Sequence, residues 1–230
     1  MRFMRIGNPV PRWAATAPAI VVVLAGCGGS DRPPPEEERT NVVQPGAPGE
    51  PSQKLSPEEV AAVERDTPGH TKADIEFAQA MIHHHGQAIL MTRWVPRRSP
   101  GPDVPLLAKR MRLSQRTEIE VMQRWLRERG IEAQSPDDHH GHDHGTGKGL
   151  PPGMLTSRQL GRLFKTKGRA FDRLFLRYMT YHHRGALTMV RRLVERGGGA
   201  EPELSAFTRH VEADQGIEIA RMRRLLDDLR

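Results

Sequence analysis

Residues 74–91, DIEFAQAMIHHHGQAILM, and residues 172–189, DRLFLRYMTYHHRGALTM, decide the fold of this chain because they are two copies of one pattern. Aligned at an offset of 98, the two stretches share seven of eighteen residues. The shared pairs are Asp74/Asp172, Phe77/Phe175, Met81/Met179, His84/His182, His85/His183, Ala88/Ala186 and Met91/Met189. Successive residues of an α-helix are turned by about 100°, so all seven positions lie on one face that is about 120° wide. The repeat therefore predicts two equivalent helices whose histidines share a face with large apolar side chains.

Each copy is followed by a second repeated pattern, in residues 108–126 and 208–226, at an offset of 100. The shared pairs are Gln115/Gln215, Glu118/Glu218, Ile119/Ile219, Met122/Met222, Arg124/Arg224 and Leu126/Leu226. The glutamine, the glutamate and the methionine of each copy lie on the apolar stripe of their helix. We therefore expect an all-α fold, a four-helix bundle built from a duplicated helical hairpin, with His, Gln and Glu side chains in its interior.

Capping residues, prolines and glycines delimit the predicted helices. We expect long helices over residues 71–94, 103–129, 169–196 and 201–230, and shorter ones that begin at Ser56 and Ser157. No segment alternates with a period of two, so we expect no sheet. The predicted bundle domain covers residues 56–230, with repeat one at 70–130, a histidine-rich linker at 133–153 and repeat two at 156–230.

The first 26 residues have the pattern of a secretory signal peptide. Arg2, Arg5 and Arg12 precede an apolar run that ends in Leu24-Ala25-Gly26-Cys27, which resembles the lipobox of bacterial lipoproteins. This predicts export to the cell envelope and a lipid anchor, such as palmitate, at Cys27, on the outer or periplasmic side of a membrane. The alternative is an ordinary secreted protein with a free cysteine. Residues 27–55 are rich in Pro, Glu and Gly, which predicts a disordered tether.

The formal net charge of +7 changes once this segment is removed. Residues 1–26 hold three arginines and no acid, so Lys plus Arg falls from 35 to 32 against 28 acidic residues, and the charge to +4. Export and the lower charge argue against a nucleic-acid partner. The single cysteine excludes a disulfide framework and any site of several thiolates. A bound metal would therefore have to use His, Met and carboxylates.

The repeated polar residues of the interior need partners, because a buried polar group left unpaired costs about 1–3 kcal/mol. One solution is internal: Glu118 or Glu218 accepts a hydrogen bond from a histidine, and Gln115 or Gln215 bridges to another. The sequence leaves this solution open beside a second one, which is a metal ion.

The metal solution follows from the Met-x-x-His-His spacing. Residues three and four apart lie on one helix face, so the methionine of each copy can share an ion with either histidine. Thioether and imidazole together favour copper(I) over zinc, calcium or magnesium. The candidate ligands are Met81, His84, His85, Met179, His182 and His183, with Glu118 and Glu218 as secondary candidates. Four further methionines on these stripes complete a site or fill the core: Met91, Met189, Met122 and Met222. One central site and two equivalent sites are both compatible with the repeat.

The linker between the repeats carries a different signal. Residues 137–145 read DDHHGHDHG, which places His139, His140, His142 and His144 among three aspartates. Short His-rich tracts bind copper(II) and other borderline divalent ions with little geometric selectivity. We expect such binding here, with a polar flexible linker as the alternative.

Two motifs that each occur twice carry a family resemblance: Met-x-x-His-His-x-x-Ala, at 81–88 and 179–186, and Gln-x-x-Glu-Ile-x-x-Met, at 115–122 and 215–222. On these motifs residues 70–230 resemble a bacterial family known as domain of unknown function number 305. The resemblance implies a ferritin-like four-helix bundle exported to the cell envelope, and copper binding and tolerance are associated with some members. It also implies metal binding by the methionines and histidines of the first motif.

These observations predict a copper-binding envelope lipoprotein that sequesters or delivers the ion and is not an enzyme. Its expected partners are the metal ion and the membrane that holds the anchor; a protein partner is not predicted. One alternative is a ferritin-like di-metal oxidase, but such sites take a Glu three residues before the His of two helices, and Met81 and Met179 occupy those positions. Another is a non-metal interaction module whose Arg-rich outer faces bind acidic polymers or a protein.

Overall fold

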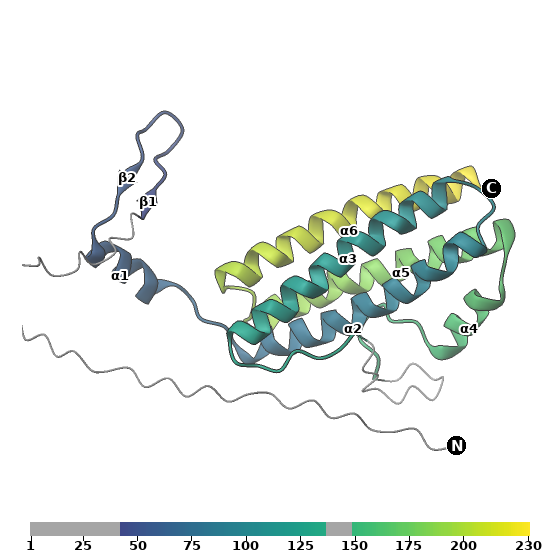
Figure 1. The fold of residues 1–230 in the computed structure, drawn as a ribbon, viewed down its shortest axis with the longest axis horizontal. Coiled ribbons are helices and arrows are strands. Elements are labelled where there is room, and N and C mark those ends of the chain that lie inside the picture. The colour runs from purple at the N-terminus through teal and green to yellow at the C-terminus, as the bar shows by residue number, and fades with distance from the viewer. Residues whose placement is uncertain (1–41, 137–148) are drawn as a thin grey trace, which may run out of the picture. The chain divides into compact units, whose positions relative to one another are not determined.

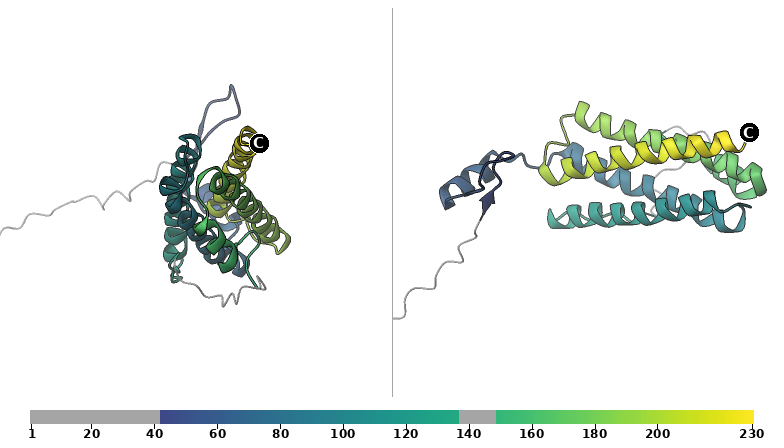
Figure 2. Two further views of the ribbon diagram at one scale, coloured as in Figure 1. Left: turned by 90° about the vertical axis from the view of Figure 1, so that its right-hand side faces the viewer. Right: turned by 90° about the horizontal axis from the view of Figure 1, so that it is seen from above.

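The computed structural model describes residues 42–136 and 149–230, and four long helices make up most of it. These are α2 (Lys72–Trp94), α3 (Asp103–Glu128), α5 (Gly168–Glu195) and α6 (Pro202–Asp228), with the shorter α1 (Pro57–Asp66) and α4 (Ser157–Lys165). The long helices run along one common axis (Figures 1 and 2). The all-α fold predicted from the repeat is confirmed. In the part of the chain that the structure describes, no helix is both long and apolar enough to cross a membrane.

The helix ends follow the local signals in the sequence. Thr71 and Asp74 form a full capping box at the start of α2, and Thr156 and Gln159 form another at α4. The side chain of Glu201 accepts a hydrogen bond from the Leu204 backbone and so caps α6. A short 3-10 turn, η1 (Val95–Arg97), follows α2.

The chain connects the helices as two hairpins, α2 with α3 and α5 with α6, which meet along α2 and α5. The first half of α2 and the second half of α5 pack in the same apolar cluster, so these two helices are antiparallel. The connection between α3 and α5 must therefore return along the bundle, and it includes α4. One long crossover of this kind is the connectivity of ferritin-like bundles.

Two apolar clusters fill the bundle, one towards each end. The first cluster contains apolar residues from the first half of α2, among them Phe77 and Ile82, together with Trp125 of α3 and Val211 of α6. The second cluster contains Met111 of α3, Phe175 of α5 and Met222 of α6. Between the two clusters every long helix contributes polar residues from its repeated motif. This polar layer consists of His84, His85, Gln115, Glu118, His182, His183, Gln215 and Glu218.

One expectation about secondary structure was wrong. Two-residue strands, β1 (Val43–Gln44) and β2 (Gln53–Lys54), pair antiparallel with Val43 opposite Lys54. The turn between them contains two Pro-Gly pairs, at 45–46 and 48–49, and a hydrogen bond from the Glu50 N–H to the Ala47 carbonyl. Turn residues, not side-chain alternation, form this hairpin, so a search for period-two patterns misses it. The hairpin belongs to a unit that ends at Ser56, and the helices belong to a second unit, Pro57–Arg230.

Several predictions concern residues outside those that the structure describes. They are the signal peptide over 1–26, the lipid anchor at Cys27, the tether as far as residue 41, and metal binding by His139, His140, His142 and His144.

Candidate metal centre

The two histidine pairs of the repeat meet in the polar layer. His84 and His85 on α2 and His182 and His183 on α5 are all buried. The rings of His84 and His182 face each other, with centroids 3.7 Å apart and planes inclined by 34°. Because α2 and α5 are antiparallel and cross at this level, the two repeats build one shared layer of histidines.

In each pair, one histidine binds a glutamate on the partner helix of its own hairpin. His85 Nε2 donates a hydrogen bond to Glu118 Oε2 on α3, and His183 Nε2 lies 2.5 Å from Glu218 Oε2 on α6. An ionised carboxylate can only accept, so each of these rings carries a proton on Nε2. The internal pairing of a histidine with Glu118 or Glu218 is thus confirmed, and it occurs in both repeats.

His84 is held in the same way by a backbone carbonyl. Its Nε2 lies 3.1 Å from the oxygen of Pro152, which lies near the C-terminal end of the linker, shortly before α4. A carbonyl oxygen only accepts, so Nε2 of His84 is also the protonated nitrogen.

The other ring nitrogen of each histidine has no such partner. Among the described residues, no hydrogen bond reaches Nδ1 of His84, His85, His182 or His183, nor Nε2 of His182. In a neutral ring whose Nε2 is protonated, Nδ1 carries a free lone pair. The layer therefore gathers buried ring nitrogens that have no hydrogen-bond partner, and in a neutral ring such a nitrogen carries a free lone pair.

Burial keeps the facing pair of rings neutral. Desolvation lowers the pKa of His84 well below its usual value, and the charges of His85 and His183 lower it further. Desolvation does the same to the pKa of His182, together with His84, His183 and His85. Neutral imidazole is the form that binds a metal ion.

Glu118 stays ionised although it is buried. Desolvation acts to raise its pKa, but the hydrogen bond and charge of His85 outweigh it, helped by Ser114 and His210, so the net shift is downward. This agrees with its role as an acceptor for His85.

The bridging by Gln115 that the sequence left open is not found among the described residues. Neither side-chain atom of Gln115, and not Oε1 of Gln215, has a hydrogen-bond partner within residues 42–136 and 149–230. The helix spacing correctly places both amides in the layer, but the histidine nitrogens nearest the glutamates are satisfied by carboxylates instead, because an ionised acceptor forms the stronger bond.

The methionines divide into two groups. Met81 and Met179 are fully buried and flank the layer on opposite sides, because Met81 belongs to the first apolar cluster and Met179 to the second. The four secondary candidates pack further into these clusters, Met122 and Met189 in the first and Met91 and Met222 in the second.

A loop closes over the layer where α5 has a glycine. Gly153 and the Pro152 carbonyl lie against Gly185, where a Cβ atom would collide with the loop backbone. Gly153 itself has a φ of +80°, which favours glycine. Gln87 ties the loop to α2, because its amide donates to the Leu155 carbonyl at 2.9 Å and accepts from the Leu155 N–H at 2.7 Å.

Sequence reasoning missed a second group of metal-ligand side chains. Glu118, His210 and Asp214 place one ligand atom each within 4.8 Å of the others. Among the described His, Cys, Asp and Glu residues, no other group of three meets this condition. His210 and Asp214 have no counterpart in repeat one, where Arg110 and Ser114 stand, so the repeat could not point to them. Their i, i+4 spacing on α6 was the available signal.

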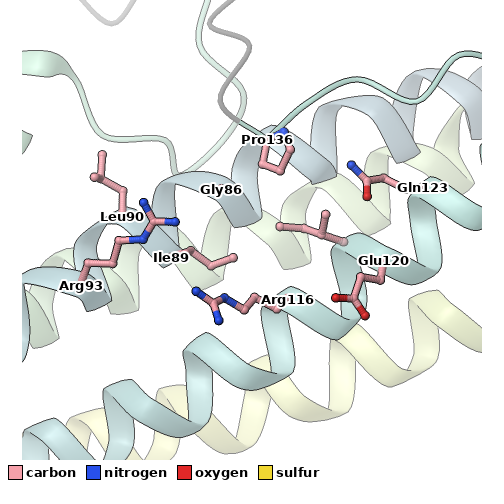
Figure 3. A pocket seen from close by; sticks show the side chains of 9 residues that line it. Gly86, Ile89, Leu90, Arg93, Arg116, Glu120, Gln123 and Pro136 are labelled. Carbon is pink, nitrogen blue, oxygen red and sulfur yellow. The ribbon is translucent and has the colours of Figure 1, made fainter. Parts of the chain in front are cut away.

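A cavity of about 400 Å³ lies between α2 and α3, on the side where Pro136 crosses Gly86. Arg93, Arg116 and Glu120 extend around it (Figure 3). None of the residues that line it is a histidine or a methionine, so this cavity is separate from the histidine layer.

Fold and site together define a ferritin-like helical bundle made from two hairpins, with a buried layer of histidines at their interface. A family model for the domain of unknown function DUF305 matches residues 74–226, so the chain belongs to this family.

Solved structures of similar fold include two further DUF305 proteins. One, from Streptomyces coelicolor and described as secreted, is 29% identical, with a TM-score of 0.58 over 68% of this chain and 93% of that one. A fragment from Deinococcus radiodurans is 28% identical, with a TM-score of 0.60 over 70% of this chain and 99% of that one.

CopM in its Cu(II)-bound form is 24% identical, with a TM-score of 0.56 over 68% of this chain and 97% of that one. CopM has also been solved in Cu(I)-bound and Ag-bound forms. Comparison with curated proteins gave no match.

Proposed function

We propose that the histidine layer binds copper(I) and that the protein sequesters or delivers this ion. The observation that carries the proposal is the orientation of the imidazoles: three rings direct Nε2–H to an oxygen acceptor and leave Nδ1 unpaired. Metal-ligating histidines almost always have this second-shell arrangement, in which the other ring nitrogen donates to a carboxylate or a backbone carbonyl. The unpaired Nδ1 atoms are then the ligand atoms.

The residues beside the layer favour a soft ion. The four core histidines alone do not place three ligand atoms within 4.8 Å of one another. Met81 and Met179, one on each side of the layer, supply thioether ligands that can complete the set. Imidazole with thioether favours copper(I) among the common biological ions. We infer one central site shared by the repeats, because His84 and His182 are in contact.

CopM is a protein of the same fold that has been solved with copper and with silver, which supports a copper-related role for this chain. We further propose that the protein is exported, which the description of the Streptomyces coelicolor protein as secreted supports. We also propose that it is lipid-anchored at Cys27, on the Leu24-Ala25-Gly26-Cys27 motif. The His-rich linker is proposed to collect copper(II) or another divalent ion.

We propose binding without catalysis. Ferritin-like di-metal centres use carboxylates from all four helices. The polar layer described above has two, Glu118 and Glu218, and each already accepts from a histidine.

The test replaces the two candidate methionines by leucine, which removes the sulfur but keeps the volume of the side chain. We expect Met81→Leu with Met179→Leu to weaken copper(I) binding at least tenfold, because leucine fills the space but has no lone pair. The matched control is Met111→Leu, another fully buried methionine, on α3. Competition with a chromophoric copper(I) chelator under reducing conditions measures the affinity.

A second variant carries the full candidate set to alanine: Met81, His84, His85, Met179, His182 and His183. Unchanged copper(I) affinity in this variant, with its helical content retained, overturns the proposal.

A further inference from the structure

We propose a second, peripheral site for a divalent cation, formed by Glu118 on α3 and by His210 and Asp214 on α6. It does not rest on copper(I) binding in the histidine layer. His210 Nε2 lies 3.3 Å from Asp214 Oδ2 and 3.9 Å from Glu118 Oε1. Two ligand atoms that are each about 2.1 Å from a tetrahedral or octahedral ion lie about 3.0 to 4.2 Å apart. Both distances fall in this range, and the Glu118 and Asp214 ligand atoms lie within 4.8 Å of each other, so the three side chains are close enough to converge on one ion.

The site has one anchored ligand and two accessible ones. The side chain of Glu118 is 4% exposed, whereas those of His210 and Asp214 are 57% and 36% exposed. Ser114 donates a hydrogen bond of 3.0 Å to Glu118 Oε1 and lies 3.4 Å from Asp214 Oδ2. The buried carboxylate is thus oriented before any ion arrives, and the open side admits the ion from solvent.

The two oxygens of Glu118 serve different neighbours. Oε2 accepts from His85 inside the layer, and Oε1 faces Ser114 and His210 on the outer side. Glu118 therefore joins the peripheral site to the histidine layer. The repeat has no second version, because Arg110 and Ser114 occupy the positions that correspond to His210 and Asp214.

The ligand chemistry selects the class of ion. One imidazole and two carboxylates, with no sulfur, suit a borderline divalent ion such as zinc, cobalt(II) or copper(II), and not copper(I). The peripheral site and the layer therefore differ in the ions they take, which allows each to be measured separately.

The experiment is a cobalt(II) titration of the full chain, followed by the visible absorption of bound cobalt(II). All proteins carry Asn in place of His139, His140, His142 and His144, so that the linker does not contribute. We expect His210→Ala and Asp214→Asn each to lose one equivalent of bound cobalt(II). Arg110→Ala, at the corresponding position of repeat one, should bind as many equivalents as the parent.

His210 and Asp214 lie at the surface, so these variants should fold normally, which circular dichroism checks. Equal cobalt(II) stoichiometry and affinity in the parent and in His210→Ala overturn the peripheral site. The outcome is independent of copper(I) competition, which tests the layer and should be unchanged in His210→Ala.

Discussion

At the residue scale, the histidine layer shows how hydrogen-bond partners select one nitrogen of a ring. Glu118, Glu218 and the Pro152 carbonyl take up Nε2–H of His85, His183 and His84. Each acceptor thereby determines the tautomer and turns Nδ1 towards the remaining space. Met81 and Met179 likewise combine two roles, because a methionine that packs in the core keeps its sulfur available to a soft ion.

The lowered pKa values of His84 and His182 predict an acid-sensitive fold in the metal-free protein. In the unfolded chain a histidine binds its proton at about pH 6.5, whereas burial prevents protonation in the folded state. Between the unfolded and the folded pKa the unfolded state binds more protons, so the free energy of unfolding falls as pH drops. The slope is at most about 1.4 kcal/mol per pH unit for each histidine.

Urea denaturation of metal-free protein from pH 7.5 to 5 measures this slope. A variant with His84→Leu and His182→Leu should have a flatter dependence in this range, because leucine does not titrate. An unchanged slope would show that other groups cause the acid sensitivity. The lowered pKa of Glu118 adds a loss of stability in more acidic solution, as pH falls below the ordinary value of 4.5.

At the element scale, the contact between residues 151–155 and α5 positions the Pro152 carbonyl, which accepts a hydrogen bond from His84. Gly185 and Gly153 allow the loop backbone to approach the helix closely, and Gln87 holds the loop from the side of α2. The Pro152 carbonyl reaches His84 only because of this approach. A helix glycine, which usually lowers helix stability, is here a requirement of the site.

Gly185→Ala should therefore destabilise the protein by about 1–3 kcal/mol, because its methyl group collides with Pro152 and Gly153. It should also weaken copper(I) binding, since the displaced carbonyl no longer orients His84. The matched control is Gly216→Ala on α6, where a Cβ meets no atom within 4 Å. The control should stabilise the helix by about 0.5–1 kcal/mol.

Chemical denaturation and chelator competition on both variants check the prediction. If Gly185→Ala were as stable as Gly216→Ala, the close approach of the loop would not exist in solution.

At the scale of the whole molecule, a ligand in the layer links both hairpins and should stabilise the bundle as a unit. Silver(I), which is soft and stable in air, is a convenient probe. When free silver(I) is a hundred times its Kd, binding adds about 2.7 kcal/mol to the free energy of unfolding. For a domain of this size that is a rise in Tm of roughly 5–10 °C.

Thermal unfolding with and without silver(I), and after its removal by a soft-metal chelator, measures the shift. His84→Ala with His182→Ala should abolish most of it, whereas His210→Ala should retain it. A full shift in the double variant would place the silver site outside the layer.

The sequence alone determined the repeat, the helix ends and the placement of His, Met, Gln and Glu on inward faces. The repeat is visible in the sequence itself, and the helix ends and inward faces depend on neighbours within one or two turns, through capping and helix periodicity. It also left open the pairing of a histidine with Glu118 or Glu218 as one of two solutions, because both glutamates lie on inward stripes.

The tertiary structure alone decided which atoms meet. That His84 faces His182, that Pro152 accepts from His84, and that His210 lies beside Glu118 are contacts between residues 68 to 98 positions apart in the chain. The antiparallel crossing of α2 and α5 and the closing loop produce these contacts. Local periodicity determines which face of its helix a side chain is on. Only the packing of one helix on another determines its position along the bundle axis and the residue that it contacts.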